Sequence, residues 1–577
     1  MRFRPVMVAI VTVVAVLTGV VGAPGVQQSL AAWNDAEFVR ASLRTLDCTS
    51  PSIFRSTANA RLVSGTAFAA APDDAAANSV TATAVGAGTT VDRSNAVAVG
   101  GGYRSVVDTA ALAANATYSI PTTVALPTTT PTPAGWVSAT GNGRQGATSG
   151  ILTASGAVDS AGVASAPSRW TSVHLASIVA QATGAPLSTA APGITALELR
   201  TGGFASAASI DACAARWTAT TNSLLRSYQV GAMRYELASP SVQSLVDTAR
   251  TARTSLVNSV QGIANNTTLS SNISSGVTAL LAGLLGLLGL GTASSTVSAT
   301  LATSELAALD ALLVGTASDS TGLVTIDFAT GTVSIDAAKL QGALNGRDPN
   351  SPLVFTPAQS AAVATAISGA VATWSASVVA ALQRAAGAVR VSSTTVIDLT
   401  ATVLGAQLTV ARIEAKVIDT PIASMAASQA TVTTTVLPAA GLLTGVVSAL
   451  VGGLVSGLVS GVGTVVAQLV AALLAPTYNT VVPQAATIAT TLGTQVGGAM
   501  TTVFGPSGIA LLSLNAQNQP KTGTNPVPAS LAALPAGRYD VGAVRVEIRP
   551  RTGAVSSAVG RWLMLGSSSV GPATLLN

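Results

Sequence analysis

The sequence predicts an α+β fold that is strand-rich and β-sandwich-like, with several long helices rich in Ala, Gly and Leu. Hydrophobic residues make up 49% of the 577 residues and charged residues only 9%, whereas a typical domain is about 25% charged. Many stretches alternate β-branched with small residues between Gly and Pro positions, which is typical of strands. Other stretches repeat apolar residues at helical spacing. This composition excludes intrinsic disorder, which requires low hydrophobicity and high charge.

The N-terminus has the features of a secretory signal peptide. Two arginines in "MRFRPV" precede an apolar region at 6–22, and Ser29 and Ala31 stand at the −3 and −1 positions of a small-residue cleavage site. We therefore predict a signal peptide over 1–31 and an extracellular or cell-surface location. The alternative is that this segment stays in place as a membrane anchor.

The residues after the predicted cleavage site alternate strictly. In "LAAWNDAEFV", Trp33, Asp35, Glu37 and Val39 occupy every second position. This resembles the signal class of some secreted surface and biofilm-fibre proteins, in which a small–aromatic–x–Asp pattern follows the cleavage site. The simpler interpretation is a first β-strand, and the two interpretations are compatible.

The chain contains two cysteines, Cys48 and Cys213. An even cysteine count in an exported chain favours a disulfide. Closing a loop of about 100 residues is worth about 4.7 kcal/mol on loop-entropy grounds, and this longer loop somewhat more. Two buried free thiols are the alternative.

Changes in composition divide the chain into six parts. They are a signal peptide (1–31), a β-rich N-terminal domain closed by the disulfide (32–237), a helical apolar block (238–320), a mixed α+β segment (321–435), an uncharged Gly/Val-rich helical block (436–520) and C-terminal strands (521–577).

Local signals predict individual elements. Pro240 follows Ser239, which suits the first turn of a helix, and residues 324–336 alternate about a Thr330-Gly331 turn, which predicts a hairpin. A helix is expected from Pro357 to about Ala386.

In two further stretches, charged residues alternate with apolar ones. In "LTVARIEAKVI", Arg412, Glu414 and Lys416 share one side, which predicts a strand solvated on that side. The C-terminal part repeats the pattern with Arg545 and Glu547.

The stretch "LVGGLVSGLVSGVGTVVAQLVAALL" at 450–474 is apolar and long enough to cross a bilayer. Gly453, Gly457 and Gly461 form a small-residue face that allows close helix packing. Each glycine, however, costs a helix about 1 kcal/mol relative to Ala, and no Lys or Arg lies nearby to set topology. We predict that this block and the one at 275–291 are helices packed within the protein or against a second copy. A membrane span at about 440–475 is the alternative.

Residue types that commonly act in catalysis are sparse in this sequence. His174 is the one histidine and lies among apolar neighbours, so a structural role is expected. "GNGRQG" at 141–146 has phosphate-loop spacing but no convincing helix after it, so a Gly-rich turn is expected. The basic residues are scattered, which argues against nucleic-acid binding. We predict no cofactor, no metal and no small-molecule substrate. A secreted hydrolase that uses isolated Asp and Glu residues is the alternative.

The signal with "LAAWNDAEFV", the downstream "LDC", the paired Leu/Gly/Val-rich blocks and the segment "GLVTIDFATGTVSIDAAKLQGALNG" resemble the choice-of-anchor G family. These are secreted surface proteins of high-GC Gram-positive bacteria. The resemblance implies a cell-surface location and no known catalytic activity. Because the export signal is clear and a catalytic constellation is missing, we predict a non-enzymatic structural or adhesion protein of the cell surface or extracellular matrix. Its partners would be cell-surface components or other copies of itself, with membrane contact less favoured. The chain ends "RWLMLGSSSVGPATLLN", which lacks a sortase-type signal, so covalent wall attachment is not expected.

Overall fold

The structure is a computed structural model. It describes residues 47–51, 53–66, 78–108, 124–125, 130–218, 223–264, 271, 275, 289–403, 406–421, 430–436, 479–549 and 560–576.

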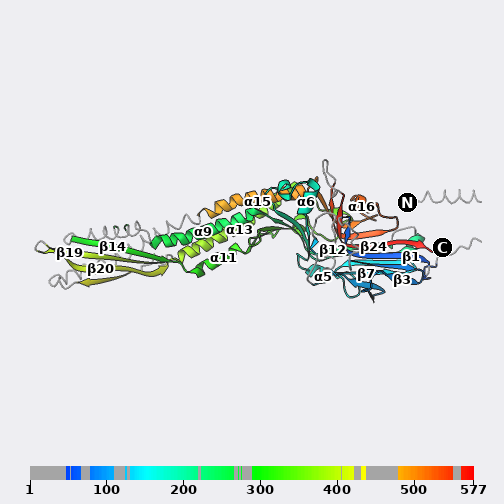
Figure 1. Ribbon diagram of the computed structural model, residues 1–577, viewed down its shortest axis with the longest axis horizontal. Helices are drawn as coiled ribbons and strands as arrows, with labels where there is room; N and C mark the ends of the chain where they lie inside the picture. The colour runs from blue at the N-terminus through cyan, green and yellow to red at the C-terminus, as the bar shows by residue number, and fades with distance from the viewer. Residues whose placement is uncertain are drawn as a thin grey trace, which may run out of the picture.

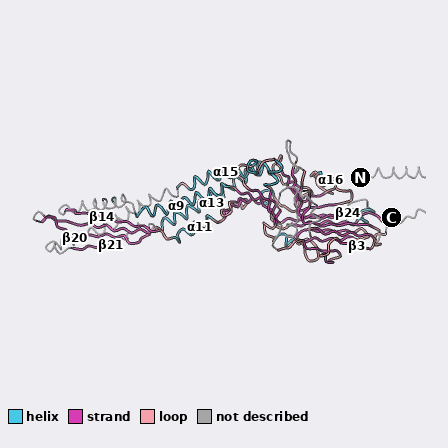
Figure 2. Tube along the Cα trace, viewed as in Figure 1, coloured by secondary structure: helices cyan, strands magenta, loops and turns pink. Residues whose placement is uncertain are grey.

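The described elements form a long, narrow molecule (Figure 1). β-Sheets form a head at one end, helices form a stalk along the middle, and long strands form a tip at the other end. Figure 2 shows the same division, with strands at both ends and helices between them. The predicted α+β, strand-rich fold is confirmed.

The first head sheet has the order β18-β22-β23-β24-β1-β2-β3, and all its pairs are antiparallel. The pairing of β1 with β24, with Ala60 opposite Ser568, joins the two ends of the described chain. The strands are β1 (Phe54–Gly65), β2 (Ser79–Val85), β3 (Gly88–Val91), β18 (Ser351–Pro352), β22 (Ala510–Gln517), β23 (Tyr539–Ile548) and β24 (Trp562–Leu575).

The second head sheet has the order β12-β11-β8-β7-β5-β4 and packs face to face on the first. The residues between the sheets are small, and the hydroxyls of Ser206 and Ser568 are 2.8 Å apart. The strands are β4 (Val97–Val99), β5 (Gly102–Val106), β7 (Ala134–Ala139), β8 (Arg144–Gly150), β11 (Phe204–Asp211) and β12 (Leu225–Val230). The short helices around the head are α5 (Ser160–Ser165), α8 (Ala212–Thr218) and α16 (Ala529–Ala532).

The neck sheet lies between the head and the stalk and has the order β15-β16-β17-β13-β10-β9-β6. Its strands are β6 (Val124–Ala125), β9 (Thr171–His174), β10 (Ala196–Thr201), β13 (Met233–Ala238), β15 (Thr316–Ser318), β16 (Val324–Asp327) and β17 (Thr332–Asp336). The helices beside it are α6 (Ala176–Thr183), α7 (Leu187–Ala190) and α12 (Ala337–Gln341).

One face of the neck sheet joins the main hydrophobic core. Tyr235 of β13 is buried there, with its ring centroid 5.1 Å from that of Phe504. The predicted hairpin at 324–336 is confirmed as β16 and β17. Gly331 has a φ of 72° at the turn, a conformation that favours glycine.

Four helices and one 3₁₀ turn build the stalk: α9 (Pro240–Ala264), η2 (Thr303–Leu306), α11 (Ala307–Leu313), α13 (Pro357–Gly387) and α15 (Val481–Phe504). The predicted helix beginning at Pro357 is confirmed. Its N-cap Thr356 and Gln359 form a capping box, which satisfies two backbone N–H groups that a helix end leaves free. Trp374 in this helix stacks on Phe328, with centroids 4.6 Å apart.

Among the described residues, α13 is the one helix whose length and composition would allow it to cross a membrane. Its side chains Val363, Ile367, Val371 and Val378 are buried, and it packs along α15. It is therefore a core helix of the stalk.

The tip sheet has the order β14-β19-β20-β21 and is antiparallel. Its strands are β14 (Gly289–Thr300), β19 (Arg390–Val403), β20 (Ala406–Pro421) and β21 (Ala430–Val436). The strand predicted in "LTVARIEAKVI" is confirmed. Its Arg412 pairs with Asp398 at 2.7 Å on the polar side of the sheet.

Two predictions of helical blocks are wrong in part. The 238–320 block contains β14 and β15, so residues 289–291 are strand, and the 436–520 block ends in β22. The prediction followed Leu and Gly content. β14 consists mainly of small and β-branched residues, which suit strands, and β22 is a short apolar segment of a kind that periodicity alone does not separate from a helix. The segments 276–288 and 437–478, with Gly453, Gly457 and Gly461, lie outside the described residues.

The interpretation of the C-terminal strand also needs correction. The strand exists as β23, but it is not solvated on its charged side, because Arg545 is fully buried. Its guanidinium pairs with Glu547, donates to Ser530 Oγ at 2.7 Å and lies 5.4 Å from the ring centroid of Trp562. The segment carrying Ser530 covers this face, a long-range contact that alternation does not report.

Close packing of α13 on α15 gives a prediction. A Cβ added at Gly493 would lie 3.1 Å from Ala364 Cβ and 3.2 Å from its Cα, whereas one at Gly498 would meet no atom within 4 Å. We expect Gly493→Leu to lower the free energy of unfolding by about 1–3 kcal/mol through overpacking. Gly498→Leu should raise it by up to about 1 kcal/mol through helix propensity. Thermal unfolding followed by circular dichroism measures both, and equal effects would contradict the packing described.

Candidate functional site

The predicted disulfide is present. Cys48 and Cys213 are bonded, with their Cα atoms 5.8 Å apart, and no free cysteine remains among the described residues. Cys213 lies in α8, directly after β11, and is fully buried. The bond therefore ties the first described residues to the second head sheet. Its presence is consistent with an oxidising, extracellular location.

The predicted signal peptide and the motif of Trp33, Asp35 and Glu37 lie outside the described residues, so both stay predictions. "GNGRQG" at 141–146 begins in the tight turn between β7 and β8 and continues into β8. A Cβ at Gly141 would lie 1.8 Å from Pro51 O, so the glycine permits a close backbone contact. This is the Gly-rich turn that the sequence predicts.

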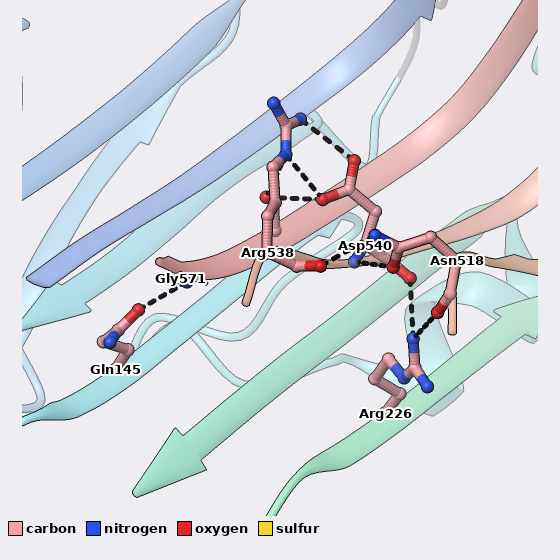
Figure 3. A network of polar contacts seen from close by, with 7 residues as sticks. Gln145, Arg226, Asn518, Arg538, Asp540 and Gly571 are labelled. Carbon is pink, nitrogen blue, oxygen red and sulfur yellow. Dashed lines mark hydrogen bonds and ion pairs between the residues drawn. The ribbon is translucent and has the colours of Figure 1, made fainter. Parts of the chain in front are cut away.

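A network of polar contacts joins the two head sheets (Figure 3). Arg538 forms a two-pronged ion pair with Asp540, at 2.8 and 2.9 Å. Asp540 N donates to Asn518 Oδ1 at 2.7 Å, and the Gln145 side-chain oxygen accepts from Gly571 N.

Arg226 connects this network to the edge of the second head sheet. Its guanidinium donates to the backbone oxygens of Asn518, Gln519 and Asp540. Burial lowers the pKa of the Arg226 guanidinium to about 10, although nearby Asp540 opposes that change. Because these hydrogen bonds run from one head sheet to the other, the network holds the sheets together.

A group of five ionisable side chains lies on the polar face of the neck sheet. Glu198 of β10 stands directly opposite His174 on one neighbouring strand and Glu236 on the other. His174 Nδ1 is 2.7 Å from Glu198 Oε1. We call this group the neck cluster; its members are His174, Glu198, Arg200, Arg169 and Glu236.

Arginines neutralise both carboxylates of the neck cluster. Arg200 bridges them, 2.6 Å from Glu198 Oε2 and 3.1 Å from Glu236 Oε2. Arg169 adds a contact of 2.9 Å to Glu236 Oε1, and the Ser334 hydroxyl donates to the same oxygen. Glycosidase-type catalysis needs two carboxyl groups that face one another across a space for the sugar, whereas here the Arg200 guanidinium lies between the two carboxylates and contacts both. The cluster is better suited to fixing the neck sheet than to proton transfer.

Sequence reasoning singled out His174 but missed its partners. "LELR" and "MRYEL" show charged residues at alternate positions, and that signal could have marked both segments as strands with a charged face. Their pairing across the sheet could not be read from local pattern. Among the described residues, no group of three or more His, Cys, Asp or Glu residues could hold a metal ion.

Residues 58–571 match the sequence model of one protein family, which is described as a domain of unknown function, DUF8394. The match spans most of the chain, so the chain belongs to this family. Neither a curated protein nor a solved structure matches it.

Removing the disulfide should destabilise the head. We expect the Cys48→Ala/Cys213→Ala double variant to lose about 2–5 kcal/mol of unfolding free energy, because its unfolded chain gains the freedom of an open loop. Denaturant unfolding with and without reductant measures this. Reductant should destabilise the wild type and leave the double variant unchanged; an equal response in both would contradict the structural role of the bond.

The neck cluster gives a matched pair of charge substitutions. The Glu236 side chain is 6% exposed, so Glu236→Gln removes the carboxylate that Arg169 and Arg200 share, although Arg200 keeps Glu198. We expect a cost of about 1–3 kcal/mol. Asp247, whose side chain is 67% exposed beside Arg250, is the control, and Asp247→Asn should change stability by less than about 0.5 kcal/mol. Denaturant unfolding of both variants measures the difference, and similar small losses would show that the cluster is dispensable.

Proposed function

We propose that this chain is a non-enzymatic, exported structural or adhesion protein of the cell surface or extracellular matrix. The observation that carries the proposal is the shape. The head and tip sheets lie at opposite ends of a narrow helical stalk (Figure 1), and such a rod suits the holding of two surfaces at a distance. The resemblance to the choice-of-anchor G family supports the same role, and the disulfide suits an oxidising compartment.

The tip sheet supports self-association as the partner mode. Outer strands of the head and neck sheets have two to six residues, whereas β14 has twelve and β21 has seven. Long outer strands present rows of backbone N–H and C=O groups that pair with other chains, and proteins usually protect them with charges, proline or short length. Neither β14 nor β21 contains a charged residue or a proline.

The outer edge of β12, the longest of the other outer strands, is protected by a side chain. There the Asn345 side chain accepts from Val230 N and donates to Val230 O, each at 2.8 Å, so the protein caps this edge itself.

The described residues place β20 on one side of β21 and no strand on the other. We infer that β21 pairs with β21 of a second copy, which the antiparallel arrangement of an isologous dimer permits.

A single substitution tests this proposal. Thr433 stands opposite Glu414 in the register of β20 and β21, so Thr433→Lys charges the edge while placing the cation across from a carboxylate. We expect the exported full-length protein to form discrete oligomers in sedimentation velocity. Thr433→Lys should weaken association at least about tenfold, and Thr433→Ser should leave it unchanged.

The same preparation tests the other parts of the proposal. The protein should be accessible to protease on intact cells and recoverable without detergent. A wild-type monomer at all concentrations would contradict self-association. Recovery only in detergent would favour the alternative of a membrane span at about 440–475. Glycosidase or peptidase turnover abolished by one Asp or Glu substitution would contradict a non-enzymatic role.

A further inference from the structure

The outer face of the second head sheet carries a groove of about 750 Å³. It lies on the face turned away from the first head sheet and crosses β7, β8, β11 and β12. Four strands span about 14 Å at normal strand spacing. The groove is therefore long enough for an extended ligand of several units.

Two rows of side chains opposite one another in the strand register form the groove. Trp136 stands at one end of the groove and Leu225 at the other, and the smaller residues between them create the hollow. The first row is Trp136, Thr148, Ala207 and Ser227, and the second is Ser138, Gly146, Ser209 and Leu225.

Three glycines and one hydrogen bond fix the indole of Trp136. Its Nε1 donates to Val99 O at 3.0 Å. A Cβ at Gly156, Gly102 or Gly146 would lie 2.2, 2.4 or 2.9 Å from the nearest neighbouring atom, and the indole is among those neighbours at each position. The ring is partly exposed and lines the groove. A ligand that stacks on it would therefore find it already ordered, which lowers the entropy cost of binding.

The polar groups of the groove are mainly neutral. Hydroxyls come from Ser138, Thr148, Ser209 and Ser227, and none of the described lining residues is a carboxylate. Arg144 stands at one end, where its Nε is 3.3 Å from Asp211 Oδ2. Arg226 also lines the groove, but its guanidinium is bonded to backbone oxygens of the opposite sheet.

We propose that this groove binds a neutral oligosaccharide, with Trp136 stacked on the C–H face of one sugar ring. Sugars combine apolar C–H faces with hydroxyls, which matches an apolar floor with a few oriented polar groups. Arg226 is held by backbone oxygens and Arg144 stands at one end beside Asp211, so no free charged side chain in the middle of the groove would select an anion. This inference goes beyond the proposed self-association at the tip, and its test does not depend on that association.

Isothermal titration of the full-length protein with cellohexaose, laminarihexaose and mannohexaose tests the proposal, with hexagalacturonic acid as the anionic comparison. At least one neutral hexasaccharide should bind. Trp136→Ala should weaken that binding at least about tenfold, as loss of an aromatic anchor does. Ala207→Trp should weaken it equally by filling the floor while Trp136 stays in place.

Val97→Trp is the matched control, because Val97 is 66% exposed on β4 of the same sheet but outside the groove. It should bind like the wild type, and circular dichroism melting should show that Ala207→Trp and Val97→Trp remain folded. The proposal is overturned if no neutral hexasaccharide binds, if hexagalacturonic acid binds more tightly, or if folded Ala207→Trp binds as well as Val97→Trp.

Discussion

The antiparallel pairing of β1 with β24 is the constraint on which the rest of the molecule depends. It runs from Phe54 opposite Leu575 to Gly65 opposite Leu563, so both ends of the described chain lie in one sheet. The parts of the chain that form the neck, stalk and tip must therefore leave the head and return to it. The chain makes this excursion to the tip twice. It first runs out along α9 and returns through β14, and it later runs out along α13 and returns along α15 (Figure 1). The tip sheet forms where these two excursions meet, as β14 pairs with β19.

Small side chains let these excursions pack closely. Between the head sheets the buried residues include Ala58, Ala60, Ala82 and Ala208, and along the stalk Gly493 lets α15 approach Ala364 of α13. Small residues bury little apolar area each, so stability must come from many close contacts. Such an interface tolerates no added volume, because interiors pack without voids that could absorb it.

The sequence predicted elements whose signals are local. The helix start at Pro357 and the turn at Gly331 follow from a few adjacent residues, and both are present. Residues whose environment depends on distant segments were not predictable in this way. Arg545 is buried because the segment around Ser530 packs over it, and Glu198 meets His174 and Glu236 only through the sheet register. Composition also does not predict the secondary structure of a block that contains both a helix and a strand, as the segment from Val481 to Gln517 does.

The low charge of the chain has a consequence for the stalk surface. Helix α15 contains no charged residue, and its polar surface is largely threonine. Four of these hydroxyls donate to the carbonyl four residues earlier, at 3.0–3.1 Å; they belong to Thr487, Thr490, Thr491 and Thr494.

A hydroxyl already bonded within its own helix has less hydration to lose than a free charge, whose burial without a partner is costly. Contact with another molecule along this surface therefore meets a small desolvation penalty. Such a surface offers few charged pairs to fix register, so the self-association proposed above would take its specificity from backbone hydrogen bonds at a strand edge. In this molecule the long strand edges lie at the tip, where the two excursions of the chain end.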